Sequence, residues 1–246
     1  VSTARFHGAI DDVRIYNNAL SAAQVRQLAT QVPAGLVFRM DTVGDANDAS
    51  GHNHALISNT GALAAGRHGA ANTAYRFTSG QLATYAHNTT LNTPNMTWSF
   101  WMKSPSMTGG DLNTSIIRKF QTFNADGWVV KYDHINYLHN YKASSTIQSA
   151  HESLVNNVWT HYAVVRSANG ATDNIYINGQ SAANNGGVGA NIANTAQMLI
   201  GANGTGDITL QDVRIYNRVL DQTEVRALSG YHADHGVAGM VFHVQA

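Results

Sequence analysis

Apolar and polar residues alternate in several short stretches of the chain, which is the period of a half-buried β-strand. Residues 158–166 are apolar on both faces, as in a central strand, and 175–180 end in Asn-Gly, a strong hairpin signal. Residues 127–132 and 135–141 form a further expected strand pair, and turn residues recur about every ten positions. The clearest alternation, at 96–103, directs four apolar side chains to one face: Met96, Trp98, Phe100 and Met102. The pattern predicts an all-β sandwich or jelly roll with Trp98 and Phe100 buried.

Helical signals are confined to two short segments. Ser21 and Asp221 stand where an N-cap residue belongs, and each is followed three positions later by Gln or Glu. Single helical turns are therefore expected at 21–28 and 221–228. We expect both to cover an end of the sandwich.

The sequence contains an internal repeat. Residues 10–20 return as 210–220, at an offset of 200, and residues 35–38 return as 239–242, at an offset of 204. The first motif precedes the second at both ends of the chain. The simplest interpretation is a window on a tandem array, and a single domain with an internal duplication is the alternative.

A tandem array fixes the expected domain boundaries. Residues 1–34 then hold the closing strand and helix of a preceding repeat and a linker. Residues 35–229 form one complete domain, and 230–246 hold a linker and the opening strand of a following repeat. We expect the chain to be an excised piece of a longer protein, with any export signal upstream.

Composition narrows the partners and the location. Charged residues make up 12% of the chain and the formal net charge is zero, so no basic stripe is available for nucleic acid. No stretch approaches the roughly 18 apolar residues of a membrane span, so membrane insertion is not expected. The chain has no cysteine, and its core must supply its stability. The many Asn, Thr and Gly residues favour an extracellular or cell-surface protein, and the lack of cysteine favours a bacterial one.

Six segments, in order, resemble the laminin-G-like jelly-roll domains of the concanavalin-A-like lectin and glucanase kind. The resemblance extends over 35–229 and implies an all-β, two-sheet antiparallel jelly-roll β-sandwich whose first and last strands are neighbours. The segments are Asp48 to Asn53 (D-x-S-G-x-N), Gly66 to Phe77, Thr97 to Lys103, Trp159 to Arg166, Ile175 to Gly179, and Asp212 to Leu228.

The resemblance implies a structural Ca²⁺ site. In many members of the family the loop after the first strand and the Asp of the closing strand share one ion. This makes Asp48, Ser50, Asn53 and Asp212 the expected ligands, and Ca²⁺ prefers such hard oxygens. The alternative is that Asp48 and Ser50 form an Asx-type turn while Asp212 bonds a backbone amide. A zinc site at His52 and His54 is less favoured, because no third ligand stands at a recognisable spacing.

Catalysis is not expected. Glycosidases on this fold need two carboxylates across the scissile bond. The chain has only two glutamates: Glu224 stands in the helix cap, and Glu152 has no acidic residue at alternate positions. The sequence therefore favours a non-catalytic module.

Carbohydrate binding is the alternative function, and its candidate site is a glycan platform on one sheet. Sugar sites use exposed aromatic faces beside polar side chains. Trp128, Tyr137, His139 and Tyr141 lie on neighbouring expected strands and are the candidate ligand-binding residues. Packing of these aromatic rings in the core or at a sheet edge is the favoured interpretation, because most aromatic residues of a sandwich belong to its core.

The favoured function is a structural or adhesive extracellular module of a larger repeat protein. Its two terminal segments each carry a strand that lacks the rest of its sandwich, and unpaired strands seek partners. We expect them to pair through Asp12, Val13, Ile15, Val241 and Phe242, within one chain or between chains. Strand exchange, in which the N-terminal copy replaces residues 207–217, is a further option. Partners are therefore other copies of the chain or neighbouring repeats, and glycans under the alternative.

Overall fold

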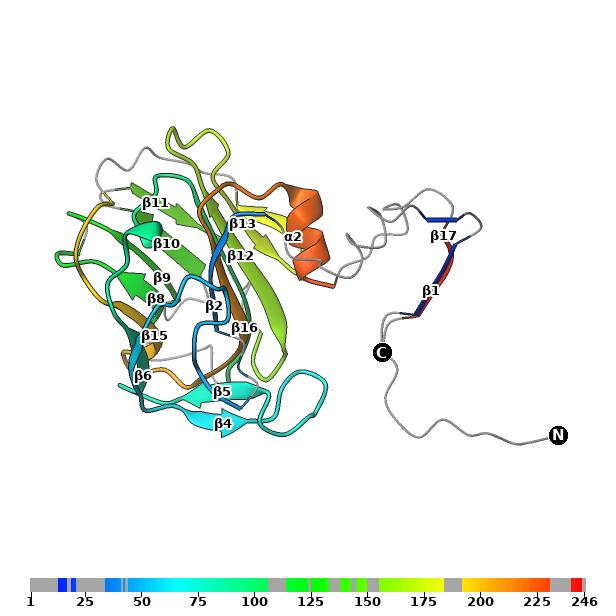
Figure 1. The fold of residues 1–246 in the computed structure, drawn as a ribbon, viewed down its shortest axis with the longest axis horizontal. Coiled ribbons are helices and arrows are strands. Elements are labelled where there is room, and N and C mark those ends of the chain that lie inside the picture. Colours follow the sequence, from blue (N-terminus) through cyan, green and yellow to red (C-terminus); the bar gives the residue numbers. More distant parts are fainter. Residues whose placement is uncertain are drawn as a thin grey trace. The chain divides into compact units, whose positions relative to one another are not determined.

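The chain divides into two compact units, which are described separately (Figure 1). The larger unit runs from Val32 to Tyr231, and the smaller one combines Val1–Gln31 with His232–Ala246. The computed structural model describes residues 13–16, 19–20, 34–40, 42, 44–105, 114–123, 125–132, 138–142, 145–149, 155–183, 192–230 and 240–244.

Two antiparallel sheets make up the larger unit. The first has the order β11-β10-β9-β8-β15-β6-β3. Its strands are β3 (Leu56–Asn59), β6 (Leu82–Tyr85), β8 (Thr114–Lys119), β9 (Trp128–Tyr132), β10 (Leu138–Lys142), β11 (Ser145–Gln148) and β15 (Met198–Asn203).

The second sheet has the order β14-β13-β12-β7-β16-β5-β4, and β2 also pairs with β16. Its strands are β2 (Leu36–Met40), β4 (Ala62–Ala64), β5 (Ala74–Phe77), β7 (Met96–Lys103), β12 (Thr160–Arg166), β13 (Asn174–Ile177), β14 (Gln180–Ala183) and β16 (Ile208–Tyr216). The opening strand β2 and the closing strand β16 are thus neighbours, and the predicted all-β antiparallel sandwich is confirmed.

The core lies between the two sheets. In β7 the side chains of Trp98 and Phe100 are fully buried, as the alternation predicted, and they belong to one large apolar cluster. Trp98 packs against Trp128 of β9, with 5.0 Å between ring centroids. Contacts of this kind join the two sheets and remove large aromatic surfaces from water.

A second, smaller cluster lies on the other side of the eight-stranded sheet. Helix α2 (Gln222–Leu228) packs Val225 and Leu228 against residues of β12, β13 and β16. Asp221 accepts a hydrogen bond from Glu224 N while the Glu224 side chain accepts from Asp221 N, which completes a capping box. This confirms the helix expected at 221–228, and the one expected at 21–28 lies outside the described residues. A 3₁₀ turn, η1 (Thr89–Leu91), was not expected.

The smaller unit contains a two-stranded antiparallel sheet of β1 (Val13–Tyr16) and β17 (Met240–Val244). Val13 pairs with Val244 and Ile15 with Phe242, and the register shifts before Tyr16. None of the helices among the described residues is long and apolar enough to cross a membrane.

Candidate functional site

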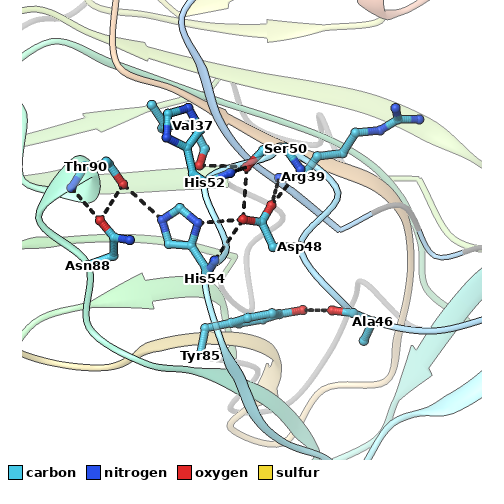
Figure 2. A network of polar contacts seen from close by, with 10 residues as sticks. All are labelled: Val37, Arg39, Ala46, Asp48, Ser50, His52, His54, Tyr85, Asn88 and Thr90. Carbon is cyan, nitrogen blue, oxygen red and sulfur yellow. Dashed lines mark hydrogen bonds and ion pairs between the residues drawn. The ribbon is translucent and has the colours of Figure 1, made fainter.

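The loop after β2 returns to that strand at Asp48, which forms an isolated bridge with Met40. The Asp48 carboxylate accepts five hydrogen bonds (Figure 2). Its Oδ1 accepts from Arg39 N at 3.1 Å and Ser50 N at 2.9 Å. Its Oδ2 accepts from Ser50 Oγ at 2.9 Å, His54 N at 3.0 Å and His54 Nδ1 at 2.7 Å. One carboxylate therefore fixes the whole loop from 48 to 54.

His54 carries this network to the next layer of the fold. The His54 side chain is buried, and its Nε2 lies 3.0 Å from Thr90 Oγ1. Its ring packs edge to face with the ring of Phe38, with 5.5 Å between centroids. Thr90 in turn contacts Asn88, the residue that caps η1. The network in Figure 2 thus links the opening strand, the Asp48 loop and η1.

The hydrogen bonds decide the charge state of Asp48. Burial by itself raises the pKa of this carboxyl, but hydrogen bonds from the His54 side chain and from the His54 and Arg39 amides act the other way. The net effect holds the pKa of Asp48 well below its usual range. Asp48 is consequently ionised at neutral pH although its side chain is only 1% exposed.

The expected calcium ligands do not fit a calcium site. The lone pairs of the Asp48 carboxylate are used by protein donors, which leaves no open coordination face for an ion that needs six to eight oxygens. Asp212 faces guanidinium groups, at 2.7 Å from Arg214 Nε and 3.5 Å from Arg39 Nε. Asn53 is exposed. The bond from Ser50 N to Asp48 Oδ1 matches the alternative interpretation, an Asx-type turn.

Sequence reasoning placed Asp48 and Ser50 together but missed the role of His54. The sequence holds one signal for it, the histidine pair in His52-Asn53-His54. The two histidines differ in their surroundings, since His52 is exposed and His54 is buried against Asp48. No group of three metal-ligating side chains occurs among the described residues.

The expected glycan platform needs a correction at Trp128. Its indole is 1% exposed, packs on Trp98, and donates its Nε1–H to Leu91 O at 3.1 Å, so it is a core residue. His139 and Tyr141 lie in β10, but the side chains of this strand beyond Leu138 are outside the described part of the chain. Tyr137 lies outside the described residues altogether. Of the residues expected to pair the terminal strands, Val13, Ile15, Val241 and Phe242 lie in β1 and β17, and Asp12 is outside the described residues.

A second polar and aromatic cluster lies on the outer side of the eight-stranded sheet. Trp101 of β7 is paired with His161 of β12 on one side and Gln211 of β16 on the other. The Arg67 guanidinium lies over the Trp101 ring, 4.4 Å from its centroid, and Lys103 Nζ lies 5.4 Å from the centroid of Trp159. We call this set the Trp101 face: Arg67, Trp101, Lys103, Trp159, His161 and Gln211. The sequence did hold a signal for it, since the residues of β7 that alternate with the buried set include Trp101 and Lys103.

Comparisons with known proteins agree on the fold. The family model described as the concanavalin A-like lectin/glucanases superfamily matches residues 77–226, which is more than half of the chain. No curated protein sequence matches.

Solved structures with the same fold include toxin binding domains at low sequence identity. The binding domain of Paraclostridial Mosquitocidal Protein 1 is 20% identical, with a TM-score of 0.64 over 79% of this chain and 52% of that one. The binding domain of botulinum neurotoxin DC in complex with SialylT is 16% identical, with a TM-score of 0.62 over 80% and 51%. A botulinum neurotoxin type C structure, whose title describes cell entry dependent on two ganglioside molecules, is 16% identical, with a TM-score of 0.65 over 80% and 51%. The chain spans about half the length of these chains.

Proposed function

We propose, starting from the fact that the chain belongs to the concanavalin A-like lectin/glucanases superfamily, that it is a non-catalytic extracellular module that joins neighbouring copies or repeats. The joint is the pairing of an opening strand with a closing strand. These are the two strands that lie side by side within the sandwich itself.

The observation that carries this proposal is a shared register. In the sandwich, β16 and β2 align Val213 with Met40 and Ile215 with Phe38, and the register shifts between Ile215 and Tyr216. In the smaller unit, β1 and β17 align the four corresponding residue pairs, and the shift falls at the corresponding place, between Ile15 and Tyr16. The residues of β1 and of 213–216 are identical. The terminal strands therefore pair in the same register as the two strands that close the sandwich.

A non-catalytic role is supported by the use of the carboxylates. Glu224 is held by the α2 capping box and by a bidentate ion pair with Arg218. Glu152 lies outside the described residues. Among the described acidic residues, Asp48 is saturated by donors, and Asp173, fully buried, lies 2.6 Å from Arg166 Nε. Carboxylates spent in this way cannot act as the acid and base of a glycosidase.

The test is a cysteine cross-link in the terminal sheet. The chain has no cysteine, so the double variant Ile15→Cys/Phe242→Cys introduces the only pair. Directly opposed strand residues lie about 4.5–5.5 Å apart at Cα, within disulfide range. If the module joins copies, oxidation gives a ladder of covalent oligomers on non-reducing gels, and the ladder lengthens with protein concentration.

The matched control is Arg14→Cys/Phe242→Cys, because position 14 pairs with 243 and not with 242, so these two positions are not opposed in the ladder and should not cross-link efficiently. Cross-links found only within single chains at every concentration would refute the joining function while leaving the pairing intact. No cross-link in either variant would refute both.

Glycan recognition is a second candidate function. It is favoured by the partly buried tryptophans of the Trp101 face and by two structures of the same fold, whose titles name SialylT and gangliosides as ligands of those proteins. The platform expected around Trp128 does not support it, because that indole is in the core.

A further inference from the structure

Two tryptophans are held on the outer side of the eight-stranded sheet, away from the core. Strand alternation turns Trp98 and Phe100 inward and Trp101 and Lys103 outward. Trp159 directly precedes β12 and lies beneath Lys103 of the neighbouring strand. Trp101 and Trp159 are both partly exposed, whereas Trp98 and Trp128, the other two tryptophans of the chain, are fully buried.

The loop between β4 and β5 brings a cation onto this face. Arg67 N donates to Gln211 Oε1 at 3.0 Å, which anchors the loop on β16, and the Arg67 guanidinium then lies over Trp101. Arg67 Nε also donates to His68 Nε2 at 2.9 Å. Each outward indole is thus accompanied by one cation, Arg67 on Trp101 and Lys103 on Trp159.

Charge of one sign gathers beside the two indoles. Arg39 and Arg214 lie next along the sheet, and both contact the carboxylate of Asp212. Arg76, further along, is matched by Asp207. The described part of this surface therefore has more cations than carboxylates, although the whole chain has a formal net charge of zero. Such a surface complements an anionic ligand.

Two ring nitrogens at the centre of the face have no hydrogen-bond partner among the described residues. They are Trp101 Nε1 and His161 Nδ1, and the two rings meet edge to face with 5.4 Å between centroids. His161 Nε2 is engaged by Ser99 Oγ at 2.9 Å. Burial, helped by the nearby Arg214 and Arg67 charges against the opposing pull of Asp212, lowers the pKa of His161 to about 3, so the ring is neutral. An indole N–H and a neutral imidazole suit a ligand rich in hydroxyl groups, which both donate and accept.

We propose that the Trp101 face binds an acidic saccharide, of the uronate or sialate type. The sugar rings stack their C–H faces on Trp101 and Trp159, and the sugar carboxylate binds Arg67 and Lys103. After the Arg67 guanidinium moves away from the indole, sugar hydroxyl groups form hydrogen bonds with Trp101 Nε1 and His161 Nδ1. This rests on the second proposed function and is independent of the terminal strand pairing. Two partly exposed indoles fit a saccharide, and the neutral pI near 7.4 does not favour nucleic acid.

The experiment is calorimetric titration of the full chain with two acidic probes, trigalacturonate and sialyllactose, and two neutral ones, galactotriose and lactose. At least one acidic probe binds and its neutral counterpart binds at least about tenfold more weakly. Trp159→Ala and Arg67→Ala each weaken acidic binding by at least about tenfold. The matched control is Lys131→Ala, which removes a cation that lies over Phe123 on the other sheet, and it leaves binding unchanged.

Each other outcome overturns a distinct part of the proposal. Equal binding of acidic and neutral probes refutes the acidic class and leaves glycan recognition standing. Acidic binding that survives both Trp159→Ala and Arg67→Ala, in variants that melt like the parent, refutes this face as the site. Absence of binding by all four probes refutes the site and the second function together, while the cross-linking test still judges the first.

Discussion

At the scale of single residues, two buried charges are held by different means. Asp48 is an anion saturated by five protein donors, and Lys119 is a cation held by neutral oxygens. The Lys119 ammonium donates to Asn92 Oδ1 at 2.7 Å, Asn194 O at 3.0 Å and Asn194 Oδ1 at 2.7 Å. Both groups fasten loops that are distant in sequence, so each should matter for stability.

Replacing the anion tests the network in Figure 2. Asp48→Asn removes the charge and turns one acceptor into a donor, and we expect a loss of about 3 kcal/mol in the free energy of unfolding. Because the folded-state pKa of Asp48 lies below its unfolded value, its contribution to stability is complete above about pH 5 and is lost as pH falls further. Urea unfolding of parent and variant should therefore differ most at pH 7 and converge toward pH 2.

The control is Asp45→Asn, since Asp45 is exposed and its carboxylate accepts a hydrogen bond from Asn47 N. It should cost much less than Asp48→Asn at neutral pH. Thermal melting of parent and Asp48→Asn with and without Ca²⁺ tests the calcium site. Because the described donors fill the carboxylate of Asp48, added Ca²⁺ should leave the melting temperature unchanged. A calcium-dependent rise that Asp48→Asn abolishes would restore the family's metal site.

The buried cation gives the opposite pH dependence. Burial lowers the pKa of Lys119 to about 8, and the Asp126 charge offsets this only partly. The unfolded chain therefore holds this proton at higher pH than the folded one, and the contribution of Lys119 to stability increases between about pH 8 and pH 10. Lys119→Met should cost about 2–4 kcal/mol at pH 7, because it leaves buried oxygens unpaired.

Chemical denaturation at pH 7, 8 and 9.5 measures this effect. We expect the stability of the parent relative to Lys119→Met to rise with pH across this range. Lys131→Met is the matched control, because Lys131 lies on the same sheet but is only partly buried. A parent and variant with parallel pH profiles would show that Lys119 does not titrate in this way.

At the scale of elements, the two strand pairs that contain the repeated sequence are the most informative feature. β16 changes register between Gln211 and Arg214 where it pairs with β7, and Asp212 there has a φ of 53°. Asp tolerates this left-handed conformation better than most residues. At this bulge Asp212 lies against Arg39 and Arg214, which gives the acidic residue of the closing strand two cationic neighbours.

At the scale of the whole molecule, the division into two units predicts independent folding. A chain trimmed to residues 32–231 keeps both sheets, the core and α2. Its melting temperature should lie within about 4 °C of that of the full chain, which corresponds to roughly 1 kcal/mol. Calorimetry of both proteins measures this. Loss of a cooperative transition on trimming would show that the terminal strands are needed to complete the sandwich.

The sequence alone determined the features that depend on local periodicity and on repetition. Alternation in 96–103 reports which side chains face the core, because successive strand residues point to opposite sides. The capping residues of 221–228 act within one helical turn. The family resemblance identified β2 and β16 as neighbours. The repeated motif related the terminal segments, which form β17 and β1, to these two strands.

Only the tertiary structure decided how the side chains of the candidate sites are used. Whether Asp48 binds a metal or the protein depends on its donors, and of these Arg39 and His54 lie outside the Asp48–Asn53 motif. Whether Trp128 or Trp101 can face a ligand depends on which side of its strand is covered by the opposite sheet. In the sequence both tryptophans stand in short aromatic stretches of similar pattern. The lone pairs of a carboxylate and the faces of an aromatic ring are occupied by residues that are close in space but distant in sequence. A sequence pattern does not specify which residues these are.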